Sequence, residues 1–354
     1  MFFNFIKYIS PTWYFNLQPV NNTIPYKVDY NLLNDDEKGQ LDFDPNYSTE
    51  TISKLDAAYQ AWHKGILKTD LKYKLTTLNS KPTLIDEYYF IRKYYKSFWS
   101  VYILLIRIFS LHNPFKEFYA FYKTRKTKKV DLYKSIFSYK EYANFQSSLL
   151  KANPLVSIII PTLNRYIYLE DVLNDLENQD YRNFEIIIID QSEPFKEDFY
   201  KNRNIKIKVI YQKEKALWLA RNSGIKTAKG DYLLFYDDDS RIERDWITQH
   251  IKTLDYFKAD ISSGVSISVV GAPVPISYSF FRWSDQIDTG NFLIKKSIFK
   301  TTGLFDRQFE GQRMGDGEFG MRCYLNGFKN ISNPFSRRIH LKVAEGGLRQ
   351  MGSW

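Results

Sequence analysis

Three consecutive carboxylates, Asp237, Asp238 and Asp239, directly follow the apolar run 232–236. Packed together, these carboxylates repel one another, so a positive group should lie among them. Carboxylate oxygens are the ligands that hard cations such as Mg²⁺ and Mn²⁺ prefer, and open α/β sheets bind ligands at strand ends. The triplet therefore predicts a divalent metal site at the end of a buried strand. The alternative is a solvated acidic turn.

A second acid, Asp190, ends the apolar run 184–190, and an earlier run, 156–160, is closed by Pro161. Together these runs outline a nucleotide-binding half-sheet, in which an acid at a strand tip can accept hydrogen bonds from a ribose or a base. Neither of these runs is followed by a Gly-x-Gly-x-x-Gly or Walker loop, so another group must hold any phosphates. This again favours a metal at the Asp triplet. A loop-capping role for Asp190 remains the alternative.

The chain changes character near residue 153, where short β-branched runs begin to alternate with amphipathic stretches. This alternation is typical of a mostly parallel sheet flanked by helices. We expect an α/β catalytic domain over 153–354 and a largely helical accessory region over 1–152. The expected strands are 156–160, 184–190, 205–211, 232–236 and 261–270, and the expected helices are 168–178, 216–228, 244–257, 295–301 and 318–325.

Residues 88–129 form a basic, aromatic-rich arm within the first region. The arm carries ten lysines and arginines against a single acid, Glu117. Basic residues around an aromatic, apolar stretch suit a helix that lies in the interface of an anionic membrane. Packing of this helix on the catalytic domain, with its lysines merely solvated, is the second interpretation, and both remain open.

The composition narrows the class of protein. The 354 residues carry a formal net charge of +10, which suggests anionic partners. Nucleic acid is not among the expected partners, because the basic residues cluster in one arm without a recognition module. Cys323 is the only cysteine, so a reducing compartment is expected. We find neither a signal peptide nor a run of about 18 apolar residues. These features predict a cytoplasmic protein, peripheral on the inner face of the cell membrane if the arm binds lipid.

In order and spacing, several segments resemble glycosyltransferase family 2, the inverting, nucleotide-sugar-dependent enzymes with the Rossmann-like GT-A fold. The resemblance covers about residues 153–345, and its segments are 157–165, 188–192, 220–224 with 228–231, 235–239 through 245–246, 290–292 with 303–306, and 315–322. It implies hexosyl or deoxyhexosyl transfer (EC 2.4 type) that depends on Mn²⁺ or Mg²⁺. The implied donor is a UDP-, dTDP- or GDP-linked sugar. The implied acceptor is a glycan or a lipid-linked hydroxyl in cell-surface polysaccharide synthesis.

The resemblance also implies roles for individual residues. Asp316 would be the catalytic base. Asp237 and Asp239 would form the Asp-x-Asp motif that binds the metal, with His340 completing the metal shell. The residues that would contact the nucleotide or its diphosphate are Thr162, Arg165, Asp190, Arg221, Asn222, Asp237 and Asp238.

Two of these roles have structural alternatives. Asp316 could simply cap a helix, and His340 could be an ordinary core or surface histidine. Family members often carry Glu-Asp where this chain has Gly315-Asp316. The absent acid puts the acceptor contacts in doubt, and Glu318, two residues further on, is the second candidate for the base.

Two other functions remain open. A catalytically inactive, transferase-like binding scaffold would keep the sheet without the reaction. A sugar-phosphate nucleotidyltransferase would share the sheet and the metal. Its first loop should be rich in glycine with a basic residue for the triphosphate, whereas this chain has Thr162-Leu163-Asn164-Arg165.

Overall fold

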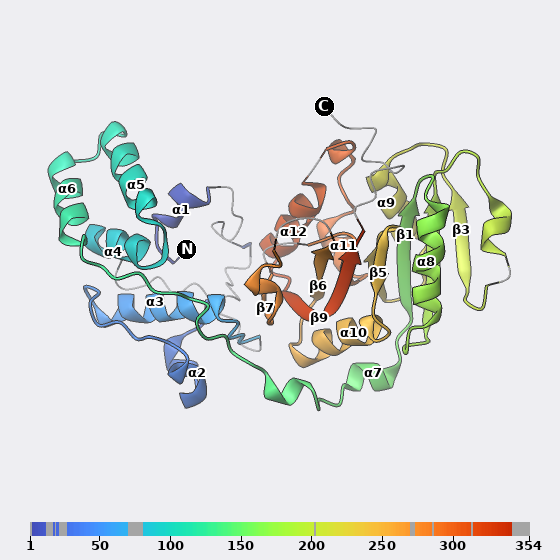
Figure 1. The fold of residues 1–354 in the computed structure, drawn as a ribbon, viewed down its shortest axis with the longest axis horizontal. Coiled ribbons are helices and arrows are strands. Elements are labelled where there is room, and N and C mark those ends of the chain that lie inside the picture. Colours follow the sequence, from blue (N-terminus) through green and yellow to red (C-terminus); the bar gives the residue numbers. More distant parts are fainter. Residues whose placement is uncertain are drawn as a thin grey trace. The chain divides into compact units, whose positions relative to one another are not determined.

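The computed structural model describes residues 2–11, 17, 19–20, 27–69, 81–201, 203–269, 273–284, 287–312 and 314–341. The chain divides into two compact units, residues 1–138 and residues 139–354 (Figure 1). Helix α7 (Ser148–Ala152) belongs to the second unit. The domain boundary expected at 152/153 stays a prediction. None of the described helices is long and apolar enough to cross a membrane.

The described part of the first unit is helical. Its helices are α1 (Ile6–Ile9), α2 (Asp35–Gly39), α3 (Glu50–His63), α4 (Leu84–Tyr94), α5 (Ser97–Phe109) and α6 (Pro114–Lys123). The ammonium group of Lys93 is buried between Asp44 and Asp56, with N–O distances of 2.7 and 2.8 Å. A buried charge is tolerated only when it is paired in this way. The pairing therefore ties α4 to α3 and to the loop that precedes α3.

The basic, aromatic arm 88–129 forms three helices, α4, α5 and α6, where the sequence suggested one. Helix α4 begins at a capping box, in which the side chains of Thr83 and Asp86 each bind the other residue's backbone N–H. Tyr88, Phe90 and Ile91 on α4 are fully buried. Part of the expected arm is therefore the core of the first unit.

The second unit is built on one mixed sheet. Its described strands lie in the order β3-β2-β1-β4-β8-β6-β9-β5, and β7 pairs with β9. Strands β3, β2, β1 and β4 are mutually parallel, and β8 joins β4 in the antiparallel direction. The bounds are β1 Val156–Thr162, β2 Phe184–Asp190, β3 Ile207–Tyr211, β4 Tyr232–Tyr236, β5 Ser240–Ile242, β6 Ile261–Ser268, β7 Arg282–Trp283, β8 Asn291–Lys295 and β9 Asn330–His340. This confirms the expected α/β fold class.

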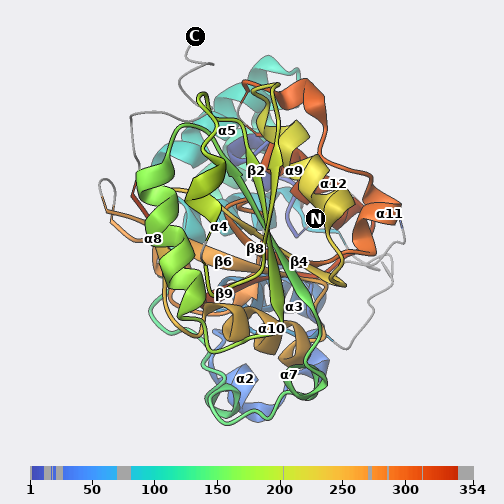
Figure 2. The same ribbon diagram turned by 90° about the vertical axis from the view of Figure 1, so that its right-hand side faces the viewer.

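Helices cover both faces of the sheet (Figure 2). Helices α8 and α10 lie on one face, and α9, α11 and α12 lie on the other. The bounds are α8 Tyr166–Glu177, α9 Leu217–Thr227, α10 Trp246–Tyr256, α11 Ile298–Thr302 and α12 Gly315–Leu325. Leu169, Val172, Leu173 and Leu176 of α8 are buried at the helical spacing that the sequence predicts. Strands β1, β2 and β4 are thus covered on both sides, which explains their largely apolar sequences, whereas the edge strand β3 is half-buried.

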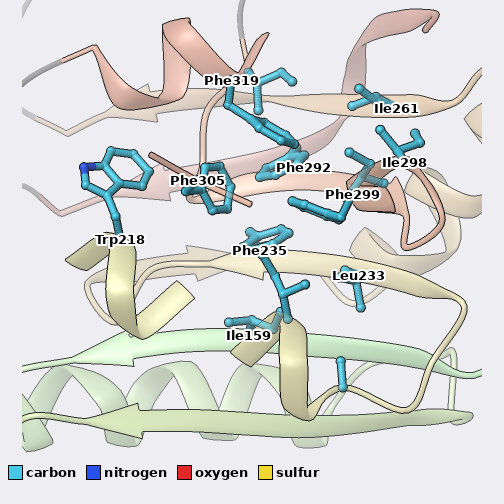
Figure 3. Packing of buried hydrophobic residues seen from close by; sticks show 14 of the residues in the cluster. Ile159, Trp218, Leu233, Phe235, Ile261, Phe292, Ile298, Phe299, Phe305 and Phe319 are labelled. Atoms are coloured by element: carbon cyan, nitrogen blue, oxygen red, sulfur yellow. The ribbon is translucent and has the colours of Figure 1, made fainter. Parts of the chain in front are cut away.

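An aromatic core lies between the sheet and helices α9, α11 and α12 (Figure 3). The rings of Phe235 on β4 and Phe292 on β8 are stacked, with centroids 4.6 Å apart. Phe305 contacts Phe235 edge-on, and Phe319 of α12 packs against Phe305. This packing fixes β4, and with it the point at which the acidic triplet leaves the sheet.

The predicted strands and helices of the second unit are present, with bounds that differ by at most three residues, whereas β5, β7, β8 and β9 were not predicted. Strands β2 and β4 have the expected bounds. Strand β9 reads Asn-Ile-Ser-Asn-Pro-Phe-Ser-Arg-Arg-Ile-His, with a proline and few apolar residues. Such a sequence has little strand propensity of its own. Its pairing with β5, β6 and β7 is what makes it a strand.

His250 lies in a buried polar network beneath the sheet. Its Nε2 lies 3.2 Å from Asn291 Oδ1, which also accepts a hydrogen bond from Trp246 Nε1, and its Nδ1 lies 2.9 Å from Ser262 Oγ. Burial lowers the pKa of His250 to about 3. The folded protein therefore keeps this imidazole neutral well below the pH at which a free histidine takes up a proton.

We predict that acid destabilises the second unit through His250. Below about pH 6.5 this histidine binds a proton in the unfolded chain but not in the folded chain. The free energy of unfolding therefore falls by about 1.4 kcal/mol for each unit of decrease in pH, from this one group. Denaturant unfolding between pH 7 and 4 should show a smaller slope for His250→Gln than for the wild type. The exposed His112 provides the control, since His112→Gln should keep the wild-type slope. Equal slopes in all three proteins would contradict the prediction.

Candidate active site

The acidic triplet lies in the turn between β4 and β5, at the carboxyl end of the parallel strands. Strand β9 runs antiparallel to β5 and places His340 opposite Ser240. The backbone N–H of Leu341 donates to the carbonyl of Asp239 at 3.0 Å. The end of β9 is therefore held against the triplet by backbone pairing.

Both carboxylate oxygens of Asp237 accept hydrogen bonds from buried arginines. Arg221 of α9 donates at 2.9 Å and Arg338 of β9 donates at 2.6 Å. Arg338 also binds Asp288 at 3.0 Å. Burial by itself lowers the pKa of Arg338, but Asp288 and Asp237 raise it above the usual arginine value. The two arginines supply the positive charge that the sequence requires near the triplet.

Helix α9, which carries Arg221, is capped from a distant part of the chain. No side chain at its own N-terminus caps it. Instead, the Glu310 carboxylate accepts hydrogen bonds from the backbone N–H groups of Trp218 and Leu219 at 3.1 and 2.8 Å. A carboxylate at this end of a helix is stabilised by the helix dipole.

The other two carboxylates of the triplet face the loop after β1. Asp238 accepts a hydrogen bond from Thr162 Oγ1 at 2.8 Å, and Arg165 lies 3.2 Å from Asp238 and 2.9 Å from Asp239. Burial raises the pKa of Asp238 to about 6, with Arg165 opposing the rise. His340 Nε2 lies 3.4 Å from Asp239 Oδ1. The structure thus brings the predicted Thr162, Arg165 and His340 together around the triplet.

Asp190 lies at the end of β2, in register with Thr162 on β1. It is fully buried. Its Oδ2 accepts hydrogen bonds from Tyr166 and Tyr200, each at 2.7 Å, and its Oδ1 accepts one from the Ser192 backbone N–H at 2.8 Å. Asp190 therefore organises the loop after β2, as the loop-capping alternative suggested. Its predicted contact with a base or ribose stays a prediction.

Asp316 lies in the first turn of α12, and its Oδ1 accepts a hydrogen bond from the Gly317 N–H at 2.8 Å. Burial raises the pKa of this carboxyl, and Asp288 raises it further while Arg221 lowers it. Asp316 is therefore in electrostatic range of the network around the triplet. The second candidate, Glu318, forms an ion pair with Arg322 at 2.5 Å on the same helix.

The side-chain amide of Asn222 binds the protein backbone. Its side chain both donates to and accepts from the backbone of Phe305, at 2.9 and 3.0 Å. This pair of hydrogen bonds joins α9 to the loop before α12. The predicted role of Asn222 near a diphosphate stays a prediction.

Sequence reasoning missed Arg338 and Asp288. A signal for Arg338 was available: it lies two residues before His340, so both side chains must share one face if the segment is a strand. Asp288 lies in a loop without any periodic pattern. Its position beside Arg338 follows only from the pairing of β9 with β6.

The charges of the site do not balance. Five carboxylates, of Asp237, Asp238, Asp239, Asp288 and Asp316, face three guanidinium groups, which leaves two net negative charges among these side chains. Carboxylate oxygens and an imidazole nitrogen suit a divalent cation. No group of three ligating side chains is gathered within the described residues. Of the three predicted metal ligands, Asp239 and His340 lie together, whereas Asp237 binds two arginines.

Gly290 allows the Arg338–Asp237 ion pair to form. A Cβ atom at this position would lie 1.9 Å from Arg338 Nη1 and 2.2 Å from Asp237 Oδ2. Any side chain at residue 290 must therefore displace a buried ion pair.

We predict that Gly290→Ala lowers the free energy of unfolding of the second unit by about 1–3 kcal/mol, the usual cost of overpacking. Chemical denaturation measures this change. Gly39→Ala is the matched control, because a Cβ on Gly39 meets nothing within 4 Å. An unchanged stability for Gly290→Ala would mean that the ion pair adapts without cost.

Part of this chain is similar to known proteins. Residues 157–322 match the family described as glycosyl transferase family 2. One relative is the dolichyl N-acetyl-alpha-D-glucosaminyl phosphate 3-beta-D-2,3-diacetamido-2,3-dideoxy-beta-D-glucuronosyltransferase of Methanococcus voltae. It is 28% identical over 51% of this chain and 64% of its own length. A PGL/p-HBAD biosynthesis glycosyltransferase of Mycobacterium bovis (strain BCG / Pasteur 1173P2) is 28% identical over 56% of this chain and 80% of its own length.

A third relative, the uncharacterized glycosyltransferase EpsJ of Bacillus subtilis (strain 168), is 39% identical over 25% of this chain and 27% of its own length. The chain thus spans between about a quarter and four fifths of these relatives.

Among solved structures, GalNAc-T7 with UDP, GalNAc and Mn²⁺ aligns with a TM-score of 0.49 at 18% identity, over 57% of this chain and 46% of its own. S. aureus TarS in complex with UDP-GlcNAc aligns with a TM-score of 0.47 at 21% identity, over 56% of this chain and 61% of its own. Residues 157–322 of this chain are thus similar to glycosyl transferase family 2.

Proposed function

We propose that this chain is an inverting, metal-dependent glycosyltransferase. It moves a sugar from a nucleotide-sugar donor to a hydroxyl of a glycan or a lipid-linked acceptor. The observation that carries the proposal is the convergence of the Asp237–Asp239 triplet, three arginines, His340 and Asp316 at the carboxyl end of β4. An open α/β sheet binds its ligand at this end.

The three arginines suit the donor diphosphate. Arg165, Arg221 and Arg338 come from the loop before α8, from α9 and from β9, and each is held in place by carboxylates of the triplet. The Nε of Arg221 is buried and has no hydrogen-bond partner among the described residues. A buried donor without a partner costs free energy, which a bound phosphate oxygen would recover. This supports a diphosphate beside α9.

Asp239 and His340 are the residues we propose to hold a divalent cation. When bound there, Mn²⁺ or Mg²⁺ supplies positive charge to the leaving diphosphate. Asp237, the other predicted metal ligand, binds two arginines through its two oxygens. Metal ligation by Asp237 would require one of these ion pairs to open.

The transfer step requires a base opposite the leaving group. The acceptor oxygen attacks C1 of the sugar while the bond from C1 to the diphosphate oxygen breaks. The bonding electrons leave with the diphosphate, and the acceptor proton passes to the Asp316 carboxylate. Arg221 and Arg338 stay fixed during this step, so they stabilise the developing charge without reorganising. Attack opposite to the departing group inverts the configuration at C1.

We predict that one class of nucleotide sugar binds in a metal-dependent way. Calorimetry with UDP-, GDP- and dTDP-linked sugars, first with Mn²⁺ and then with EDTA, should give binding for one class that falls at least about tenfold without metal. His340→Ala should weaken binding with Mn²⁺ but have little effect in EDTA. Failure of a folded protein to bind any donor would favour the inactive scaffold. Binding of a nucleoside triphosphate and a sugar phosphate instead would favour the nucleotidyltransferase.

We predict that Asp316→Asn leaves the donor Kd unchanged and lowers kcat about 10²- to 10⁴-fold, the usual contribution of a general base. The raised pKa of Asp316 means that the wild-type rate should fall with decreasing pH at an apparent pKa above that of a free aspartate. Glu318→Gln is the matched control and should keep most of the activity. A large loss for Glu318→Gln together with an active Asp316→Asn would reverse the two roles.

A further inference from the structure

Helix α5 presents an apolar face to solvent. Its exposed large side chains are Phe98, Val101, Tyr102, Leu105 and Phe109. Their spacing of three or four residues places them on one side of the helix. Ser100, Ile103 and Leu104 are buried on the opposite side. The exposed stripe is therefore continuous along the helix, and it is not the face that packs into the unit.

Helix α6 repeats this arrangement. Phe115, Phe118, Tyr119 and Tyr122 are exposed at the same spacing, whereas Glu117 and Ala120 on the other side are buried. Leu111, in the turn between the two helices, is the most exposed large apolar side chain among the described residues. We call the two helices and this turn, residues 97–123, the α5–α6 hairpin (Figure 1).

Polar contacts hold the hairpin in the orientation that exposes its apolar side chains. Arg107 of α5 and Glu117 of α6 form an ion pair at 2.7 Å, and Tyr88 of α4 donates a hydrogen bond to Glu117 at 2.8 Å. The Arg107 guanidinium also lies over the ring of Phe5. Turning the aromatic side chains inward would break this partly buried polar cluster. Their exposure therefore belongs to the fold of the unit.

The charge around these stripes is of one sign. The exposed basic residues between 96 and 129 are Lys96, Lys116, Lys123, Arg125, Lys126, Lys128 and Lys129. The one carboxylate in this stretch, that of Glu117, is buried. Residues 96–129 thus combine exposed aromatic side chains with cations and include no exposed acidic side chain.

We propose that the α5–α6 hairpin is the site at which this protein binds an anionic lipid bilayer. Aromatic and leucine side chains at the level of the headgroups, with basic residues beside them, are the chemistry of helices that lie in a membrane interface. The proposal concerns the first unit, so it goes beyond the transferase function and does not depend on it. It also narrows the membrane contact to the hairpin and the basic residues 125–129 that follow it, because α4 is largely buried.

We expect the wild-type protein to co-sediment with vesicles of phosphatidylcholine and phosphatidylglycerol, and much less with phosphatidylcholine alone. The triple variant Phe109→Ser, Leu111→Ser, Phe115→Ser changes side chains that are 82, 94 and 85% exposed. It should lose at least about tenfold in partitioning. The variant Lys126→Gln, Lys128→Gln, Lys129→Gln should lose about a hundredfold at low salt, with little difference at 0.5 M salt.

The control variant Leu32→Ser, Val274→Ser removes exposed apolar side chains on other elements and should bind vesicles as the wild type does. The circular dichroism spectrum and the donor affinity measured by calorimetry should be unchanged in all variants. A loss of vesicle binding can therefore be told apart from a loss of donor binding by the proposed transferase. Equal vesicle binding by the wild type and the apolar variant would overturn the proposal. A second result would also overturn it: the wild type binds no vesicles but forms dimers in sedimentation velocity, and the apolar variant does not form them. The surface would then join two copies of the chain.

Discussion

Electrostatic repulsion within the triplet Asp237–Asp239 is the constraint on which the active site depends. Three adjacent carboxylates cannot be buried together unless cations are brought to them. Arg165, Arg221 and Arg338 do this from three segments that are far apart in the sequence. The same ion pairs fix the loop after β1, helix α9 and strand β9 around one point. Neutralising the triplet therefore also assembles the site.

Strand β9 is the element that completes this assembly. It has little apolar character, yet it pairs with β5, β6 and β7 and carries both Arg338 and His340. Its residues, 330–340, lie beyond the match to the family, which ends at 322. One of the two guanidinium groups on Asp237, that of Arg338, and the imidazole of His340 beside Asp239 thus come from outside the matched segment. Residues that complete a charge balance can lie well away from the motif that creates the charge.

In the first unit, buried ion pairs hold helices together. Lys93 is satisfied entirely by Asp44 and Asp56, and neither acid is open to solvent. These pairs hold α3 and α4 together, which leaves α5 and α6 to be held by the Arg107–Glu117 ion pair. One basic and aromatic stretch of sequence thus becomes a structural helix followed by an exposed hairpin.

The sequence by itself determined the parallel strands, the helix α8 and the acidic triplet. Their apolar periodicity and the spacing of their carboxylates are local properties of the chain. It also placed Thr162, Arg165, His340 and Asp316 in one site, through a resemblance. Only the tertiary structure decided that Arg338 and Asp288 join them, and that Asn222 binds a backbone instead. The partners of a buried charge depend on strand pairing between distant segments, and local sequence patterns do not predict that pairing.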